Sequence, residues 1–127
     1  MPLVRIDVLE GRTPKQIAAL GDGVHRAMVE TIDVPSLDRF QIITPHASGW
    51  LIADPEYLGI SRSKDVIFIQ ITLNAGRTLE KKKALYAAIA RNLAADVGVR
   101  PEDVLVNLVE VAKEDWSFGN GIAQYAT

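Results

Sequence analysis

Four residues of this sequence carry groups that together could transfer a proton on a small carboxylic acid: Pro2, Asp38 and the two arginines Arg12 and Arg77. Removal of Met1, which is usual before a small residue, would leave Pro2 with a free secondary amine. An exposed α-amino group has a pKa near 8, and burial or a neighbouring cation lowers that pKa toward neutrality. Such an amine acts as a general base at working pH. The competing interpretation is that Met-Pro is a common start with no role.

Two Gly-Arg-Thr tripeptides place an arginine just before a predicted helix, at Arg12 and at Arg77. Backbone N–H groups and the helix dipole attract an anion at a helix N-terminus, and an arginine grips a carboxylate through two hydrogen bonds. Both arginines are therefore candidate carboxylate clamps. For either one alone, a solvated arginine beside a turn glycine is the simpler interpretation.

Further candidates are an aspartate before the second strand and two aromatic side chains near the end of the chain. The Asp38 carboxyl could orient a water or, when protonated, polarise a carbonyl. Its alternatives are a turn aspartate or a surface salt bridge with Arg39. Trp116 and Phe118 could wall an apolar pocket or pack across a subunit contact.

The elements that position these residues come from an internal repeat, because the sequence matches itself at the offset that separates Gly11 from Gly76. The tripeptide Gly-Arg-Thr recurs without a gap, and the apolar pattern matches more widely than the identities. Other identities at this offset are Ile6 with Ile71, Ala19 and Leu20 with Ala84 and Leu85, Arg26 with Arg91, Val34 with Val99, and Asp38 with Asp103.

Each half of the repeat predicts a strand, a helix and a second strand. Residues 3–8 alternate between apolar and polar side chains, and residues 66–73 are almost entirely apolar and β-branched or aromatic, which favours a central strand. The second strands are predicted at 37–44 and 104–111.

Both helices have clear start signals. Thr13 is a good N-cap, Pro14 suits the first helical position, and Gln16 completes a capping box. The second helix begins at Thr78, and Gly98 is a plausible C-terminal stop. Apolar residues follow at spacings of three and four in both helices.

These elements predict one α+β domain over residues 1–127, made of two tandem βαβ pseudo-repeats at about 1–44 and 66–111. The connector is expected at 45–65 and a C-terminal tail at 112–127. We expect a four-stranded mixed sheet with both helices on one face. Because no further helix is available, self-association is expected to cover the other face.

Composition excludes several classes of protein. Hydrophobic residues make up 48% and charged residues 24%, which is ordinary for a globular protein and too apolar for disorder. The net charge of −2 argues against binding nucleic acid, and the absence of cysteine excludes disulfides and thiolate sites. Two histidines argue against a histidine-rich metal site. Without an apolar membrane span or a signal peptide, we expect no membrane partner and a cytoplasmic location.

Taken in order along the chain, several short motifs make the sequence resemble the tautomerase superfamily, and within it the malonate semialdehyde decarboxylase-like group. These motifs are Pro2-Leu3, Leu9-Glu10-Gly11-Arg12-Thr13, His25, Ala27-Met28-Val29, Asp33-Val34-Pro35, Asp38-Arg39-Phe40-Gln41 and Asp115-Trp116-Ser117-Phe118-Gly119. The resemblance implies a homotrimer and an enzyme without a cofactor.

The resemblance also assigns roles to residues. It implies that Pro2 is the catalytic amine and that Asp38 and Arg77 act with it. The group has a second arginine after the third strand, and here that place falls on or beside Asn74. Arg12 matches an arginine that binds substrate in the short oxalocrotonate tautomerases.

Three functions remain open on this sequence. The first is a tautomerase, an isomerase that performs keto-enol proton transfer on a small 2-oxo acid, with Pro2, Asp38 and Arg77 as catalytic residues. Arg12, Asn74, Trp116 and Phe118 are then the predicted substrate-binding residues. The second is a malonate semialdehyde decarboxylase or hydratase acting on a small β-oxo acid, ranked lower because Asn74 lacks the charge of an arginine. The third is a non-catalytic trimeric binding protein on the same fold.

Overall fold

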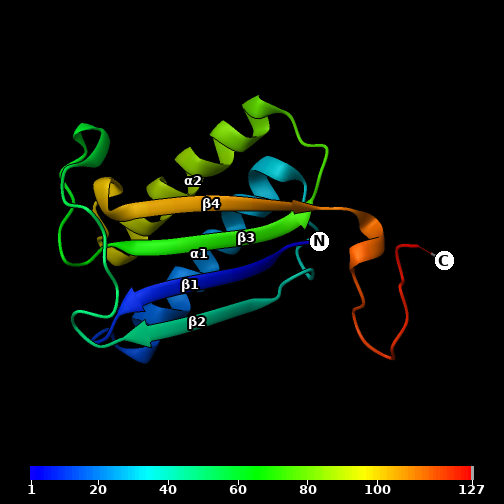
Figure 1. Cartoon of the computed structure of the whole chain (residues 1–127), viewed down its shortest axis with the longest axis horizontal. Coiled ribbons are helices and arrows are strands. Elements are labelled where there is room, and N and C mark those ends of the chain that lie inside the picture. The colour runs from blue at the N-terminus through cyan, green and yellow to red at the C-terminus, as the bar shows by residue number, and fades with distance from the viewer. Residues whose placement is uncertain (127) are drawn as a thin grey trace.

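The structure, a computed structural model that describes residues 1–126, is a four-stranded mixed sheet with two long helices packed on one face (Figure 1). This confirms the predicted α+β fold. The strands are β1 (Leu3–Leu9), β2 (Gln41–His46), β3 (Ile67–Asn74) and β4 (Val104–Val111), and the helices are α1 (Pro14–Ile32) and α2 (Leu79–Val97). Short 3₁₀ turns are η1 (Tyr57–Gly59), η2 (Pro101–Asp103) and η3 (Lys113–Asp115).

The order of the strands in the sheet is β2-β1-β3-β4. Within each repeat the two strands run parallel, β1 with β2 and β3 with β4, as a helical crossover requires. The two repeats meet at β1 and β3, which run antiparallel with Leu3 opposite Thr72. Consequently the beginning of β1 lies beside the end of β3.

Local signals set the helix boundaries as predicted. The Thr13 side chain accepts a hydrogen bond from the Gln16 backbone N–H, and the Gln16 side chain accepts one from the Thr13 N–H, which closes the capping box. Thr78 caps α2 in the same way through the Lys81 N–H. Gly98 ends α2 in the left-handed conformation with φ of 73°, where a Cβ would be strained.

The core lies between the sheet and the helices. The alternate residues Val4, Ile6 and Val8 of β1 are fully buried, and so are the helix residues Leu20 and Leu85. Neither helix of the described chain is apolar enough to cross a membrane. The opposite face of the sheet carries no helix (Figure 1). It mixes polar side chains with apolar ones, and Ile42, Leu105 and Val109 stay between 37% and 41% exposed.

The predicted start of the second strand is wrong. The structure begins β2 at Gln41 rather than at residue 37, because two tight turns precede it. In these turns the Asp38 N–H donates to the Pro35 carbonyl and the Arg39 N–H to the Leu37 carbonyl, each over 3.0 Å. Asp38 therefore lies in a turn and not in a strand.

The predicted boundary of the connector is also wrong, because β2 continues through Pro45 to His46. A proline fits there because β2 is an edge strand, so its missing N–H breaks no ladder bond. The connector accordingly begins at residue 47.

Candidate functional site

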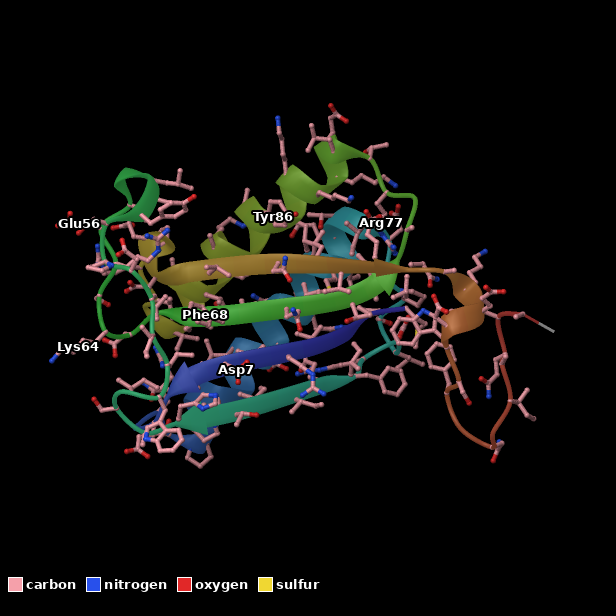
Figure 2. The ribbon with its side chains drawn as sticks, in the orientation of Figure 1. Asp7, Glu56, Lys64, Phe68, Arg77 and Tyr86 are labelled. Atoms are coloured by element: carbon pink, nitrogen blue, oxygen red, sulfur yellow. The ribbon has the colours of Figure 1, made fainter. Side chains whose placement is uncertain are left out.

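The antiparallel pairing of β1 and β3 brings together residues from distant parts of the chain at one end of the sheet. Pro2 stands just before β1 and is buried, and Asn74 ends the neighbouring strand β3. The Ala75 N–H donates to the Val111 carbonyl, which ties the tail to the same end. Figure 1 shows the N-terminus beside the start of this tail, and Figure 2 shows Arg77 at that end.

The turn that carries Asp38 is fixed from two sides. The Val4 N–H donates to the Phe40 carbonyl over 3.0 Å, which holds the turn against β1. On the helix side, the Gln41 side-chain amide donates to the Gly21 carbonyl over 2.8 Å. Gly21 permits this approach, because a Cβ there would lie 2.7 Å from Oε1 of Gln41. Asp38 is thus held close to the N-terminus of the chain.

A cavity of about 220 Å³ opens directly onto Pro2. Its lining is mostly apolar and consists of Pro2, Leu3, Phe40, Trp116, Ser117 and Phe118. The size suits a molecule of a few heavy atoms, and the aromatic walls lower the local polarity around the proline.

Three aromatic rings line this cavity, and a fourth, Tyr125, packs against one of them. Trp116 stacks on Phe118 with ring centroids 5.4 Å apart and an angle of 12° between the planes. Phe118 also contacts Phe40 at 6.2 Å and meets Tyr125 edge-on at 5.0 Å. The sequence indicated Trp116 and Phe118 but missed Phe40 and Tyr125. Their only signals were the place of Phe40 two residues after Asp38 and the position of Tyr125 in an aromatic tail.

The indole of Trp116 fixes the orientation of Asn74. Its Nε1–H donates to Oδ1 of Asn74 over 2.7 Å. An indole nitrogen can only donate, so the amide oxygen must face Trp116. The two N–H donors of the Asn74 amide are therefore on the side away from Trp116, available to an acceptor.

Asp38 is a buried carboxyl surrounded by positive charge. Its side chain is 10% exposed, and Oδ2 lies 4.0 Å from the α-amino nitrogen of Met1. Burial raises the pKa of Asp38, and the terminal ammonium, His25 and Arg77 oppose that rise. The other oxygen, Oδ1, is buried and has no hydrogen-bond partner within the described chain.

The amino group at this place is shifted in the opposite direction. Burial lowers the pKa of the Met1 amine, Asp38 partly restores it, and Arg77 lowers it further. The phenol of Tyr125 has a raised pKa, first because of burial and then because of the Asp38 charge. The environment of the N-terminus thus favours a neutral amine next to a carboxyl with a raised pKa.

Arg77 connects two elements at the edge of this site. Its Nε donates to the Ile32 carbonyl over 3.3 Å and its Nη1 to the Asn74 carbonyl over 3.1 Å. These bonds link the end of α1 to the turn after β3. The positive charge of Arg77 reaches both Asp38 and the terminal amine.

Arg12 is not brought to this site within one chain. It follows the far end of β1 and lines a different hollow of about 430 Å³, together with Ser63, Arg100 and Asp103. Asp103 stands at the repeat position of Asp38, but Ser63 satisfies both of its oxygens, through its N–H at 2.7 Å and its hydroxyl at 2.6 Å. The two halves therefore differ in chemistry, since the second carboxylate is structural.

No group of three or more metal-ligating side chains occurs anywhere in residues 1–126. The site itself offers one carboxyl, one arginine and an amide, which suits a small organic acid better than a metal ion.

Comparison with known proteins gives consistent results. Two family models, each described as a tautomerase enzyme, match residues 38–119 and residues 2–60. The probable tautomerase YusQ of Bacillus subtilis is 43% identical over 124 residues, which cover 98% of each chain.

Solved structures agree as well. FG41 malonate semialdehyde decarboxylase, inhibited by 3-bromopropiolate, is 45% identical with a TM-score of 0.92, covering 97% of this chain and 93% of the other. A fused 4-OT, solved as a symmetric trimer, is 29% identical with a TM-score of 0.81 and covers 98% of both chains.

Proposed function

Because the chain belongs to the tautomerase superfamily and to its malonate semialdehyde decarboxylase-like group, we propose that it catalyses keto-enol proton transfer on a small 2-oxo acid with Pro2 as the base. The observation that carries this proposal is the buried end of β1. There an amine with a lowered pKa lies beside a carboxyl with a raised pKa, at the mouth of an apolar cavity.

In the proposed reaction, removal of Met1 frees the secondary amine of Pro2. Pro2 is buried, whereas Met1 is only partly buried. Because burial already lowers the pKa of the Met1 amine, we expect it to disfavour the charged form of a Pro2 amine as well. The neutral amine takes a proton from the carbon next to the substrate carbonyl. The electrons of that C–H bond form a C=C bond, and the π electrons of the C=O bond move to the carbonyl oxygen. The resulting ammonium then gives the proton to that oxygen, which yields the enol and regenerates the amine.

Three residues orient the substrate and stabilise the charge in this proposal. Arg77 offers those of its five N–H donors that are not bound to the Ile32 and Asn74 carbonyls, and its charge attracts the substrate carboxylate. The Asn74 amide, turned by Trp116, donates to a carboxylate or enolate oxygen. Asp38, whose side chain is only 10% exposed, orients the carbonyl side of the substrate or a water.

A second reaction, decarboxylation of a β-oxo acid, is favoured by the 45% identity to a malonate semialdehyde decarboxylase. Here the Pro2 ammonium acts as an acid and polarises the β-carbonyl, and the bond to the carboxylate breaks with release of carbon dioxide. The electrons of that bond form a C=C bond as the carbonyl oxygen takes the proton of the Pro2 ammonium. The enol is then protonated at carbon and returns its hydroxyl proton to Pro2. A site that holds the carboxylate in a mostly apolar cavity supports this step, because charge is lost as the bond breaks.

The two functions are separated by parallel assays on protein whose intact mass proves that Met1 is absent. Ketonisation of a 2-oxo acid enol is followed by ultraviolet absorbance, and release of carbon dioxide from malonate semialdehyde by a coupled assay. Faster ketonisation supports the tautomerase, and faster carbon dioxide release supports the decarboxylase. No turnover of either substrate by the Pro2 form would favour the non-catalytic binding protein.

Replacing Arg77 by alanine is expected to lower kcat/KM for a carboxylate substrate by about 10- to 100-fold, because a charge-assisted clamp contributes about 1.5–3 kcal/mol. Arg91→Ala is the matched control, since that exposed arginine pairs with Glu30 on the helix surface and should leave kcat/KM unchanged. Equal kinetics in both variants would remove Arg77 from the site. Arg12→Ala in the same assay tests its proposed substrate-binding role, which in this fold requires a second subunit.

Trp116→Phe should keep the stacked wall but lose the N–H that holds the Asn74 amide. We expect kcat/KM to fall about fivefold to tenfold, the equivalent of one hydrogen bond of roughly 1 kcal/mol, with the thermal midpoint nearly unchanged. Asn74→Ala in the Trp116→Phe background should then add little, because the two act as a unit. Full additivity in this double-mutant cycle would contradict the positioning role.

We also propose that the chain forms a homotrimer through the open face of the sheet, as the fused 4-OT structure is a trimer. The face exposes Ile42, Leu105 and Val109 around the polar pair Gln70 and Asn107, whose side chains bond each other. Sedimentation should give three times the 13.9 kDa chain mass, and Leu105→Glu should yield a smaller species. A monomer in the unaltered protein would overturn this assembly.

A further inference from the structure

Two buried polar side-chain atoms lack a hydrogen-bond partner within residues 1–126, and both belong to the surroundings of the proposed site: Nδ1 of His25 and Oδ1 of Asp38. His25 lies on the inner side of α1 and is 7% exposed. Its Nε2 is 2.7 Å from the carbonyl oxygen of Ser36, two residues before Asp38. A carbonyl can only accept, so Nε2 carries the proton, and in the neutral ring Nδ1 is an unused acceptor.

We propose that His25 is a positioning residue for Asp38: its Nε2–H fixes the turn through Ser36, and a second proton on Nδ1 makes the ring a cation that balances the buried carboxylate. This inference rests on the role given to Asp38 in the proposed function. When Asp38 is ionised and the His25 ring is neutral, neither Oδ1 nor Nδ1 carries a hydrogen, so neither atom can donate a hydrogen bond to the other. A proton on the imidazole removes one of the two unmet acceptors and supplies the charge that the desolvated carboxylate lacks.

The second half of the repeat supports this assignment by contrast. There the carboxylate of Asp103 is satisfied by the N–H and the hydroxyl of Ser63. The residue at the repeat position of His25 is Ala90, so the half with a satisfied carboxylate has no imidazole. The histidine therefore occurs in the half of the repeat whose carboxylate has an oxygen without a hydrogen-bond partner in the described residues.

Four groups from different elements act on Asp38. The terminal amine lies 4.0 Å from Oδ2, Arg77 comes from the turn before α2, Tyr125 from the tail, and His25 from α1. Burial raises the pKa of Asp38, and the terminal ammonium, His25 and Arg77 each lower it. An imidazole ordinarily carries a proton at the pH where carboxyl groups titrate. Loss of the His25 ring should consequently raise the pKa of Asp38 further.

The test compares two substitutions of His25. In His25→Gln, the side-chain amide can still donate to the Ser36 carbonyl but cannot take up a second proton, whereas His25→Leu removes both functions. The carboxyl carbon of Asp38 is followed by NMR as the pH changes, and its signal is assigned by its loss in Asp38→Asn. We expect the midpoint to rise by about half a pH unit or more in both variants. Only His25→Leu should lower the thermal midpoint.

An unchanged Asp38 midpoint in His25→Gln would overturn the inference and leave His25 a structural donor to Ser36. If His25→Leu fails to fold, the glutamine variant still decides. Because the titration does not need a substrate, a shifted midpoint without any turnover would count against the proposed function alone. Turnover with an unmoved midpoint would count against this inference alone.

Discussion

A chain with one extra residue before Pro2, or with Met1 retained, is expected to lose at least about a hundredfold in kcat while folding normally. General base catalysis contributes about 10²- to 10⁴-fold, and an amide nitrogen has no basic lone pair to supply it. The measurement is kcat on two samples whose intact masses differ by that one residue.

Pro2→Ala provides the matched control, because it keeps a free amine at the same place but removes the ring. Its kcat should lie between that of the chain that begins with Pro2 and that of the extended chain. This result separates the need for an amine from the need for proline itself. The thermal midpoints of all three samples must agree before their rates are compared. Full activity of the extended chain would exclude Pro2 as the proton-transfer group.

Asp38→Asn is expected to lower kcat/KM by about a hundredfold and to leave the free energy of unfolding at pH 7 unchanged or higher. The sign follows from the raised pKa of this carboxyl in the folded state. Above that pKa, folding holds a charge that burial disfavours, so Asp38 costs stability as the pH rises from the unfolded pKa through the folded one. Asparagine cannot ionise, and the cost disappears.

The control for this substitution is its repeat counterpart. Asp103 is 2% exposed and accepts two short hydrogen bonds from Ser63, so Asp103→Asn should cost about 1–3 kcal/mol of stability. The kcat of the folded fraction should remain that of the unaltered enzyme. Denaturant unfolding at pH 7 and at pH 5 measures both effects. A marked loss of stability in Asp38→Asn would show that this aspartate is structural, like Asp103.

Local chemistry made most of the fold predictable. The capping residues Thr13 and Thr78 bond groups three positions away, and the buried alternation of β1 needs only neighbouring residues. The self-similarity of the sequence then predicted two equivalent βαβ units. The prediction failed where residue type and local geometry disagree. Leu37 was predicted to begin the second strand, but it is 95% exposed in a turn before β2. The carbonyls of Pro35 and Leu37 accept the backbone hydrogen bonds that form this turn, and the strand therefore starts later.

The sequence by itself thus determined the strands and helices, because these depend on residue type and on interactions over a few positions. It offered Pro2, Asp38 and both arginines as candidates, and the choice of Arg77 came from the resemblance to a family. Only the tertiary structure shows that Arg77, and not Arg12, lies near the N-terminus within one chain. The repeat makes Arg12 and Arg77 equivalent, but the antiparallel pairing of β1 with β3 places the turn after β3 beside Pro2 and sends Arg12 to the opposite end.

The same holds for contacts such as Trp116 with Asn74, which lie 42 positions apart in the chain, and for the unpartnered atoms of His25 and Asp38. Such contacts depend on how whole strands pair and pack, and the energy that selects one pairing is spread over the entire core. A pattern of a few neighbouring residues therefore does not reveal which strands pair.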